Sequence, residues 1–102
     1  MRSVEIKKGS LESKVETLAT FTISTVFAPA YQDDTVFIRG GHDSDNLGLV
    51  YKEGAPLCLK LSKDYAAHVF DADDFDGIMF FQFVLSKPAT KDLIFPIYFK
   101  DS

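Results

Sequence analysis

The chain has 102 residues, which is enough for one domain and too few for two. Hydrophobic residues make up 46% of it and aromatic residues 14%, so it can bury an ordinary core without disulfides or a metal. Eleven basic and fifteen acidic residues give a net charge of −4, and the basic residues are scattered. This balance argues against binding to a nucleic-acid backbone, which requires clustered Lys and Arg.

Cysteine use and apolar runs bear on the compartment. Cys58 is the single cysteine, so the chain has no internal disulfide, and one thiol fits a reducing compartment. Residues 1–8 contain no apolar core of a secretory signal, and runs such as 78–81 are far too short to span a membrane. We therefore expect a cytoplasmic protein, as synthesised, that could afterwards be incorporated into a particle.

The N-terminal segment differs from the rest of the chain. Residues 1–14 are rich in charge and offer little apolar anchorage beyond Val4 and Ile6. They are predicted to form an arm that orders on a neighbouring molecule. Residues 15–102 are then predicted to form the single folded domain.

Apolar and polar residues alternate with period two along this domain, while helical periodicity is nearly absent. Leu57, Leu59 and Leu61 alternate with polar neighbours, and from 19 to 27 one apolar face includes Phe21, Ile23 and Phe27. Strands are predicted at residues 19–27, 35–39, 47–51, 57–61, 65–70, 78–85 and 93–99.

Two of these strands are apolar on both faces. Ile78 to Leu85 is predicted to be central, or to have one face covered by a partner. Leu93 to Phe99 contains Pro96, which cannot donate a hydrogen bond to a neighbouring strand. The proline predicts either an edge position for this strand or a bulge at Pro96.

Turn residues separate the strands every 8–12 positions, which is typical of an all-β sandwich or barrel. The predicted fold is a single antiparallel β-sandwich, or a flattened barrel, of about seven to eight strands with little helix. Its type is expected to be immunoglobulin-like or jelly-roll-like.

A dense group of carboxylates could bind a cation. These residues are Asp71, Asp73, Asp74 and Asp76. Carboxylate oxygens are the ligands that Ca²⁺ prefers, and Asp43 or Asp45 could add to such a site. The spacing departs from the EF-hand loop, because Gln82 stands where a bidentate Glu is required. The alternative is a solvated loop in which Asp side chains cap turns.

Residues of the types used in catalysis lack the spacing that catalysis requires. His42 precedes Asp43, and Cys58 could in principle pair with His42 or His68. The chain contains no nucleophile elbow, no zinc-protease motif and no Gly-rich phosphate loop. The sequence therefore predicts that the protein is not an enzyme.

Aromatic residues near strand ends suggest a sugar platform. Tyr98 is one of these aromatic residues, and the binding candidates among them are Tyr31, Tyr51, Tyr65 and Phe75. The stretches 34–40, 47–48 and 81–85 resemble starch-binding modules of the family-20 type, with the resemblance extending over residues 19–85. It implies a carbohydrate-binding module that stacks sugars on aromatic rings. Those modules use Trp for much of this stacking, and this chain has no Trp.

The favoured prediction is a structural or protein-interaction module within a larger assembly, such as a virion or another multi-subunit particle. A strand that is apolar on both faces leaves a patch that soluble monomers usually avoid, so a protein partner or a second copy should cover it. Neither nucleic acid nor membrane is expected as a partner. Glycan binding is the alternative function.

Overall fold

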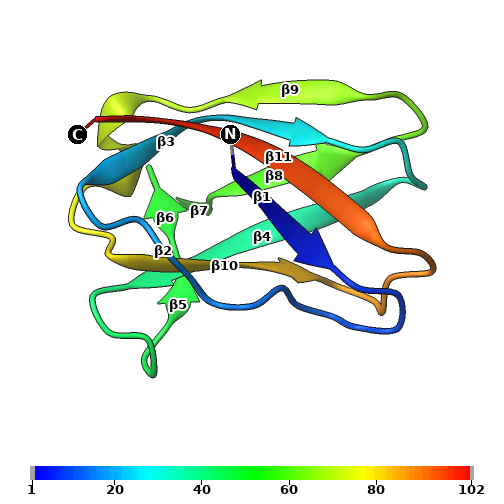
Figure 1. The fold of residues 1–102 in the computed structure, drawn as a ribbon, viewed down its shortest axis with the longest axis horizontal. Helices are drawn as coiled ribbons and strands as arrows, with labels where there is room; N and C mark the ends of the chain where they lie inside the picture. The colour runs from blue at the N-terminus through cyan, green and yellow to red at the C-terminus, as the bar shows by residue number, and fades with distance from the viewer. Residues whose placement is uncertain (1, 102) are drawn as a thin grey trace.

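Antiparallel strands dominate the computed structural model, which describes residues 2 to 101 and leaves Met1 and Ser102 outside the description (Figure 1). The strands are β1 (Arg2–Ile6), β2 (Glu16–Thr17), β3 (Phe21–Ala28), β4 (Asp34–Gly41), β5 (Gly48–Leu49), β6 (Tyr51–Lys52), β7 (Ala55–Pro56), β8 (Cys58–Leu61), β9 (Ala66–Val69), β10 (Phe80–Leu85) and β11 (Leu93–Asp101). A 3₁₀ helix, η1 (Ala72–Phe75), lies between β9 and β10. Within the described residues, no helix is long and apolar enough to cross a membrane.

Two antiparallel sheets form the body of the protein. Sheet A has the strand order β1-β11-β3-β9. Sheet B has the order β2-β10-β4-β5, and β8 also pairs with β4. β6 and β7 form a small hairpin of their own. The predicted all-β class and antiparallel sandwich are confirmed, and β10 is central in its sheet as expected.

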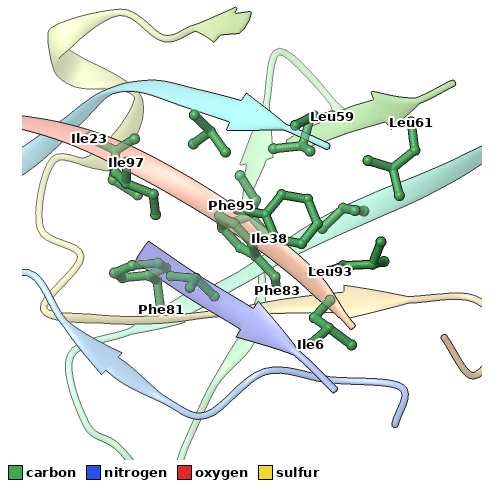
Figure 2. Close-up of a cluster of buried hydrophobic side chains, with 14 of the residues drawn as sticks. Ile6, Ile23, Ile38, Leu59, Leu61, Phe81, Phe83, Leu93, Phe95 and Ile97 are labelled. Atoms are coloured by element: carbon green, nitrogen blue, oxygen red, sulfur yellow. The ribbon is translucent and has the colours of Figure 1, made fainter. Parts of the chain in front are cut away.

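The core lies between the two sheets and is built from the inward side of each strand (Figure 2). Phe83 of β10 meets Phe95 of β11 edge to face, with ring centroids 5.3 Å apart. Phe81 packs beside Phe83 at 5.8 Å, and Ile23 and Ile97 are fully buried on the sheet A side. Burying an apolar side chain of this size stabilises the fold by about 1.5–3 kcal/mol.

The N-terminal residues differ from the predicted arm. Arg2 to Ile6 form β1, an edge strand of sheet A, in which Val4 lies opposite Phe95 and Ile6 opposite Leu93. Val4 and Ile6 are buried in the core. Two apolar residues with period two are enough for one strand, because β11 supplies the backbone partners along its whole length.

β11 also departs from the prediction of an edge position. It lies inside sheet A between β1 and β3. Pro96 lies opposite Ser3 of β1, and pairing with β3 begins only at Ile97. The register shift falls between Tyr98 and Phe99 rather than at Pro96. Pro96 has no amide hydrogen, but it lies before the first residue of β11 that pairs with β3, so no hydrogen bond to β3 is lost there.

Candidate functional site

The four predicted sugar-binding aromatics do not form one platform. Tyr31 is buried, and its hydroxyl accepts a hydrogen bond of 3.0 Å from the backbone N–H of Thr90. Phe75 is buried against Phe70, with ring centroids 5.4 Å apart. Tyr51 and Tyr65 are exposed. β6, which contains Tyr51, and the start of β9, which follows Tyr65, lie at opposite ends of the molecule (Figure 1).

A lysine occupies the middle of the predicted cation site. Lys52 Nζ lies 2.8 Å from Asp71 Oδ2 and 2.7 Å from Asp74 Oδ1. Asp74 Oδ2 also accepts a hydrogen bond of 2.9 Å from the backbone N–H of Asp71. These contacts raise the pKa of Lys52 and hold the pKa of Asp71 below its usual range. The ammonium group thus supplies the positive charge that Ca²⁺ would bring.

The other two carboxylates of this group belong to the same turn. Asp73 lies in η1, and its carbonyl oxygen accepts a hydrogen bond from the backbone N–H of Asp76. Among residues 2 to 101, no cluster of three or more His, Cys, Asp or Glu side chains is arranged to hold a metal ion. The arrangement matches the alternative of capped turns, with Lys52 as an added counter-ion.

The residues considered for catalysis lie on different elements, and β9, which contains His68, contacts β8, which contains Cys58, through the backbone of Lys60. Asp43 accepts hydrogen bonds from the Asp45 backbone and the Asn46 side chain, which lower the pKa of Asp43 and cap a turn. His68 lies in β9 of sheet A, where Nε2 is 3.1 Å from the carbonyl oxygen of Lys60. Cys58 lies in β8 of sheet B, opposite Phe37.

A different group of residues gathers on the outward side of sheet A, which we call face A. Along β11 the burial alternates, so that Phe95 and Ile97 point into the core while Ile94 and Tyr98 point outward. Face A is formed by Ser3, Thr25, Phe27, Ala67, Val69, Ile94, Pro96 and Tyr98. The sequence predicts a patch on a strand that is apolar on both faces, but it does not indicate that β3 and β9 contribute to the same surface as β11.

The strand register brings these residues side by side. Tyr98 of β11 lies opposite Thr25 of β3, and Thr25 lies opposite Val69 of β9, which makes one row across three strands. Phe27 lies opposite Ala67 in the next row. The four large apolar residues of face A are between 37% and 77% exposed. They form a mainly apolar surface contributed by three different strands, with Thr25 between Tyr98 and Val69.

Charged residues border face A but do not interrupt it. Glu5, opposite Ile94, lies at one end of the sheet. Lys100, opposite Thr22, lies at the other end, on the outward side by alternation from Tyr98. Arg2 points to the inward side, where its guanidinium lies 4.7 Å from the centre of the Phe99 ring and 3.1 Å from Glu16. The described part of the chain places no charged residue in the middle of the face.

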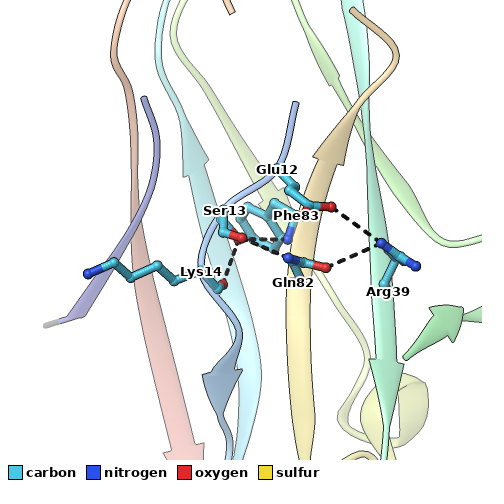
Figure 3. Close-up of polar contacts among 6 residues, drawn as sticks. All are labelled: Glu12, Ser13, Lys14, Arg39, Gln82 and Phe83. Atoms are coloured by element: carbon cyan, nitrogen blue, oxygen red, sulfur yellow. Dashed lines mark hydrogen bonds and ion pairs between the residues drawn. The ribbon is translucent and has the colours of Figure 1, made fainter. Parts of the chain in front are cut away.

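The outward side of sheet B, which we call face B, is organised around polar contacts (Figure 3). Arg39 lies opposite Gln82, and its Nη1 is 3.4 Å from Gln82 Oε1 and 3.4 Å from Glu12 Oε2. Gln82 Nε2 donates to the Ser13 carbonyl at 2.8 Å, and Ser13 Oγ accepts from the Phe83 backbone N–H at 3.0 Å. Gln82 and Ser13 are buried by these contacts.

The chain matches no family model, no curated protein and no solved structure. The function of face A must therefore be argued from the chemistry of its own residues.

Proposed function

We propose that this chain is a non-enzymatic protein-interaction module of a larger assembly, such as a virion or another multi-subunit particle, and that face A binds its protein partner. The observation that carries the proposal is the uncharged row of Tyr98, Thr25 and Val69, flanked by Phe27 and Ile94. Removing apolar area from water is favourable by about 25 cal/mol per Å², from which the costs of association are subtracted. A surface of this kind therefore gains more from a protein partner than from water.

The residue types of face A fit protein recognition. Tyr98 and Phe27 present aromatic rings, which are enriched among the residues that dominate binding energy at interfaces. They project from adjacent strands of a sheet, so little conformational entropy is lost when a partner covers them. The face has no cluster of Lys or Arg that would favour a phosphate backbone or an anionic membrane.

The non-enzymatic part of the proposal is supported by how the polar side chains are used. The carboxylates of Asp71 and Asp74 are engaged with Lys52, and the carboxylate of Asp43 caps its own turn. Catalysis requires a base and a nucleophile within hydrogen-bond reach in a recess that excludes water. We place the module in the cytoplasm, where Cys58 would remain reduced.

The test uses cells in which the chain is naturally made. Size fractionation of an extract should place the unmodified chain in a high-mass fraction. Tyr98→Asp, which sets a charge in the centre of face A, should release the chain into a low-mass fraction. Tyr51→Asp is the matched control, because Tyr51 is also an exposed tyrosine but lies in the β6–β7 hairpin.

Two results would overturn the proposal. One is an unmodified chain that runs as a free protein in the extract. The other is a folded Tyr98→Asp variant that stays in the high-mass fraction. A photo-crosslinking residue at position 69 should join the chain to its neighbour, whereas the same residue at position 51 should not.

A further inference from the structure

The two ends of sheet A differ in charge. The turns that follow β1 and β3 and those that precede β9 and β11 gather at one end, on the right in Figure 1. The turns that precede β3 and follow β9 lie at the other end. We call these the lysine end, residues 7–10, 29–33, 62–65 and 86–92, and the carboxylate end, residues 18–20 and 70–79.

The lysine end contains Lys7, Lys8, Lys63, Lys87 and Lys91, together with Asp33, Asp64 and Asp92. The carboxylate end contains Asp71, Asp73, Asp74 and Asp76 and has no Lys or Arg in its turns. Lys52, from the adjoining hairpin, neutralises part of this charge by pairing with Asp71 and Asp74. Asp73 and Asp76 remain to give that end its negative character.

The charged residues at the border of face A have the opposite sign to the turns at the same end of the sheet. Glu5 lies on the outward side near the lysine end, because it is opposite Ile94 at the start of β11. Lys100 lies on the outward side near the carboxylate end, close to the end of β11. Each end of face A therefore carries one border charge of the sign opposite to that of its turns.

We infer that the partner of face A is a second copy of this chain, packed face A to face A with the strands of the two copies antiparallel. This inference rests on the proposed function of face A. Its basis is charge complementarity. A two-fold axis that runs across the strands, in the plane of the interface, places the lysine end of one copy on the carboxylate end of the other.

The same axis also matches the border charges. It brings Glu5 of one copy toward Lys100 of the second copy, and the reverse contact occurs at the other end. A two-fold axis along the strands would instead set like ends together, and like charges at close range are unfavourable. The uncharged centre of face A allows either orientation, so the ends select the antiparallel one.

The size of the sheet is compatible with a dimer. Four strands spaced about 4.8 Å apart are about 20 Å wide, and the nine residues of β11 extend about 30 Å. Because β1 has five residues and β9 has four, the footprint is smaller than this rectangle and falls below the ~800 Å² that each partner buries in a standard interface, which fits a weak dimer. Two sheets pack in this way at a separation of about 10 Å, with their strands nearly aligned.

Analytical ultracentrifugation of the purified full chain tests the inference. The unmodified chain should form a dimer as its concentration rises through the micromolar range, because the weaker interfaces of this kind have micromolar dissociation constants. Tyr98→Arg should raise the dissociation constant about 30-fold or more, as expected for a central aromatic contact. Tyr51→Arg should leave it unchanged, and circular dichroism should show both variants folded.

Charge reversals test the orientation. Lys87→Glu combined with Lys91→Glu should weaken the dimer by about threefold per lost pair, since such pairs are exposed. Adding Asp73→Lys and Asp76→Lys to the same chain should restore the affinity. If the two lysine reversals do not weaken the dimer, or the added reversals do not restore its affinity, the lysine end does not meet the carboxylate end and the antiparallel arrangement is wrong.

The outcomes separate this inference from the proposed function. A chain that stays monomeric well above the micromolar range overturns the second copy as partner. If Tyr98→Asp still releases that chain from the high-mass fraction of cell extracts, face A binds a different protein and the proposed function stands. If the purified chain dimerises through face A yet runs only as a free dimer in extracts, the larger assembly is wrong.

Discussion

Face A and face B are both the outward sides of antiparallel sheets, and both contain large apolar side chains. On face B, Phe37, Phe80 and Val84 are half-buried, and Arg39 connects Gln82 to Glu12 across the sheet. On face A the large apolar residues are more exposed, and within residues 2–101 no charged side chain reaches across the centre. A sheet surface whose polar side chains bind one another and shield its apolar residues is stable in water without a partner. One that lacks such a network gains from a partner.

The largest expected effect concerns β1, because face A is four strands wide only if β1 stays on β11. Ile6→Ala removes a fully buried side chain opposite Leu93. It should lower the free energy of unfolding by about 2–5 kcal/mol, measured by urea denaturation. An N-terminal arm outside the core would give almost no change, so a loss below about 0.5 kcal/mol would contradict the structure of β1.

The second prediction compares the unfolding free energy lost when one side chain is replaced on each face. Gln82→Ala leaves the Ser13 carbonyl without its side-chain donor in a buried position, which should cost about 1–3 kcal/mol of unfolding free energy. Val69→Thr keeps the shape and β-branching of an exposed side chain on face A, so its effect on the monomer should stay within about 0.5 kcal/mol.

Urea denaturation of the two variants, at protein concentrations low enough to avoid association, makes the comparison. A Gln82→Ala cost within about 0.5 kcal/mol, as expected for Val69→Thr, would mean that the polar network of face B adds almost nothing to stability. Face B, with its polar network, and face A, without one, would then not differ in how they contribute to stability.

How far the sequence predicts this structure depends on the range of the interactions. The existence of a strand follows from local alternation, which predicts the strand at Leu57 to Leu61. The two apolar faces of Ile78 to Leu85 predict its central position in the sheet. The face of a side chain depends on details that alternation misses. In β3 the register passes from Thr25 to Ile23 and skips Ser24, so Ile23 points inward and Phe27 outward, although one face was predicted for both.

The candidate sites were harder to predict for the same reason. Phe75 stands among aspartates in the sequence, yet η1 turns its ring into the core against Phe70. Lys52 reaches the Asp71 and Asp74 carboxylates from a distant hairpin. Face A requires β3, β9 and β11 to pair in one register, and only tertiary structure specifies that pairing.

The third prediction concerns the ion pair at the border of face B. A double-mutant cycle with Arg39→Met and Glu12→Gln should give a coupling of about 0.2–1 kcal/mol, because both side chains are more than a third exposed. The coupling should shrink when salt is added. A larger, salt-independent coupling would mean that the pair is buried and that face B is more tightly closed than the structure indicates.

The smallest expected effect concerns Lys52, which joins the hairpin near sheet B to the turn that follows β9 of sheet A. The pKa of Asp71 is lower in the folded protein than its ordinary value, so its pairing stabilises the fold above about pH 4 and is lost as the pH falls through the folded pKa. The pKa of Lys52 is raised, so the stabilisation persists below about pH 10.4 and is lost as the pH rises past the folded pKa.

Lys52→Met should therefore lower the melting temperature slightly at pH 7 in low salt, and the difference from the unmodified chain should shrink at pH 3 as the pH falls toward the lowered pKa of Asp71. Lys60→Met is the matched control, because the Lys60 ammonium contacts the Thr35 hydroxyl rather than a carboxylate. Its effect should not change between these two pH values. A Lys52→Met deficit that persists unchanged at pH 3 would show that packing of the lysine stem, rather than its charge, joins the margins of the two sheets.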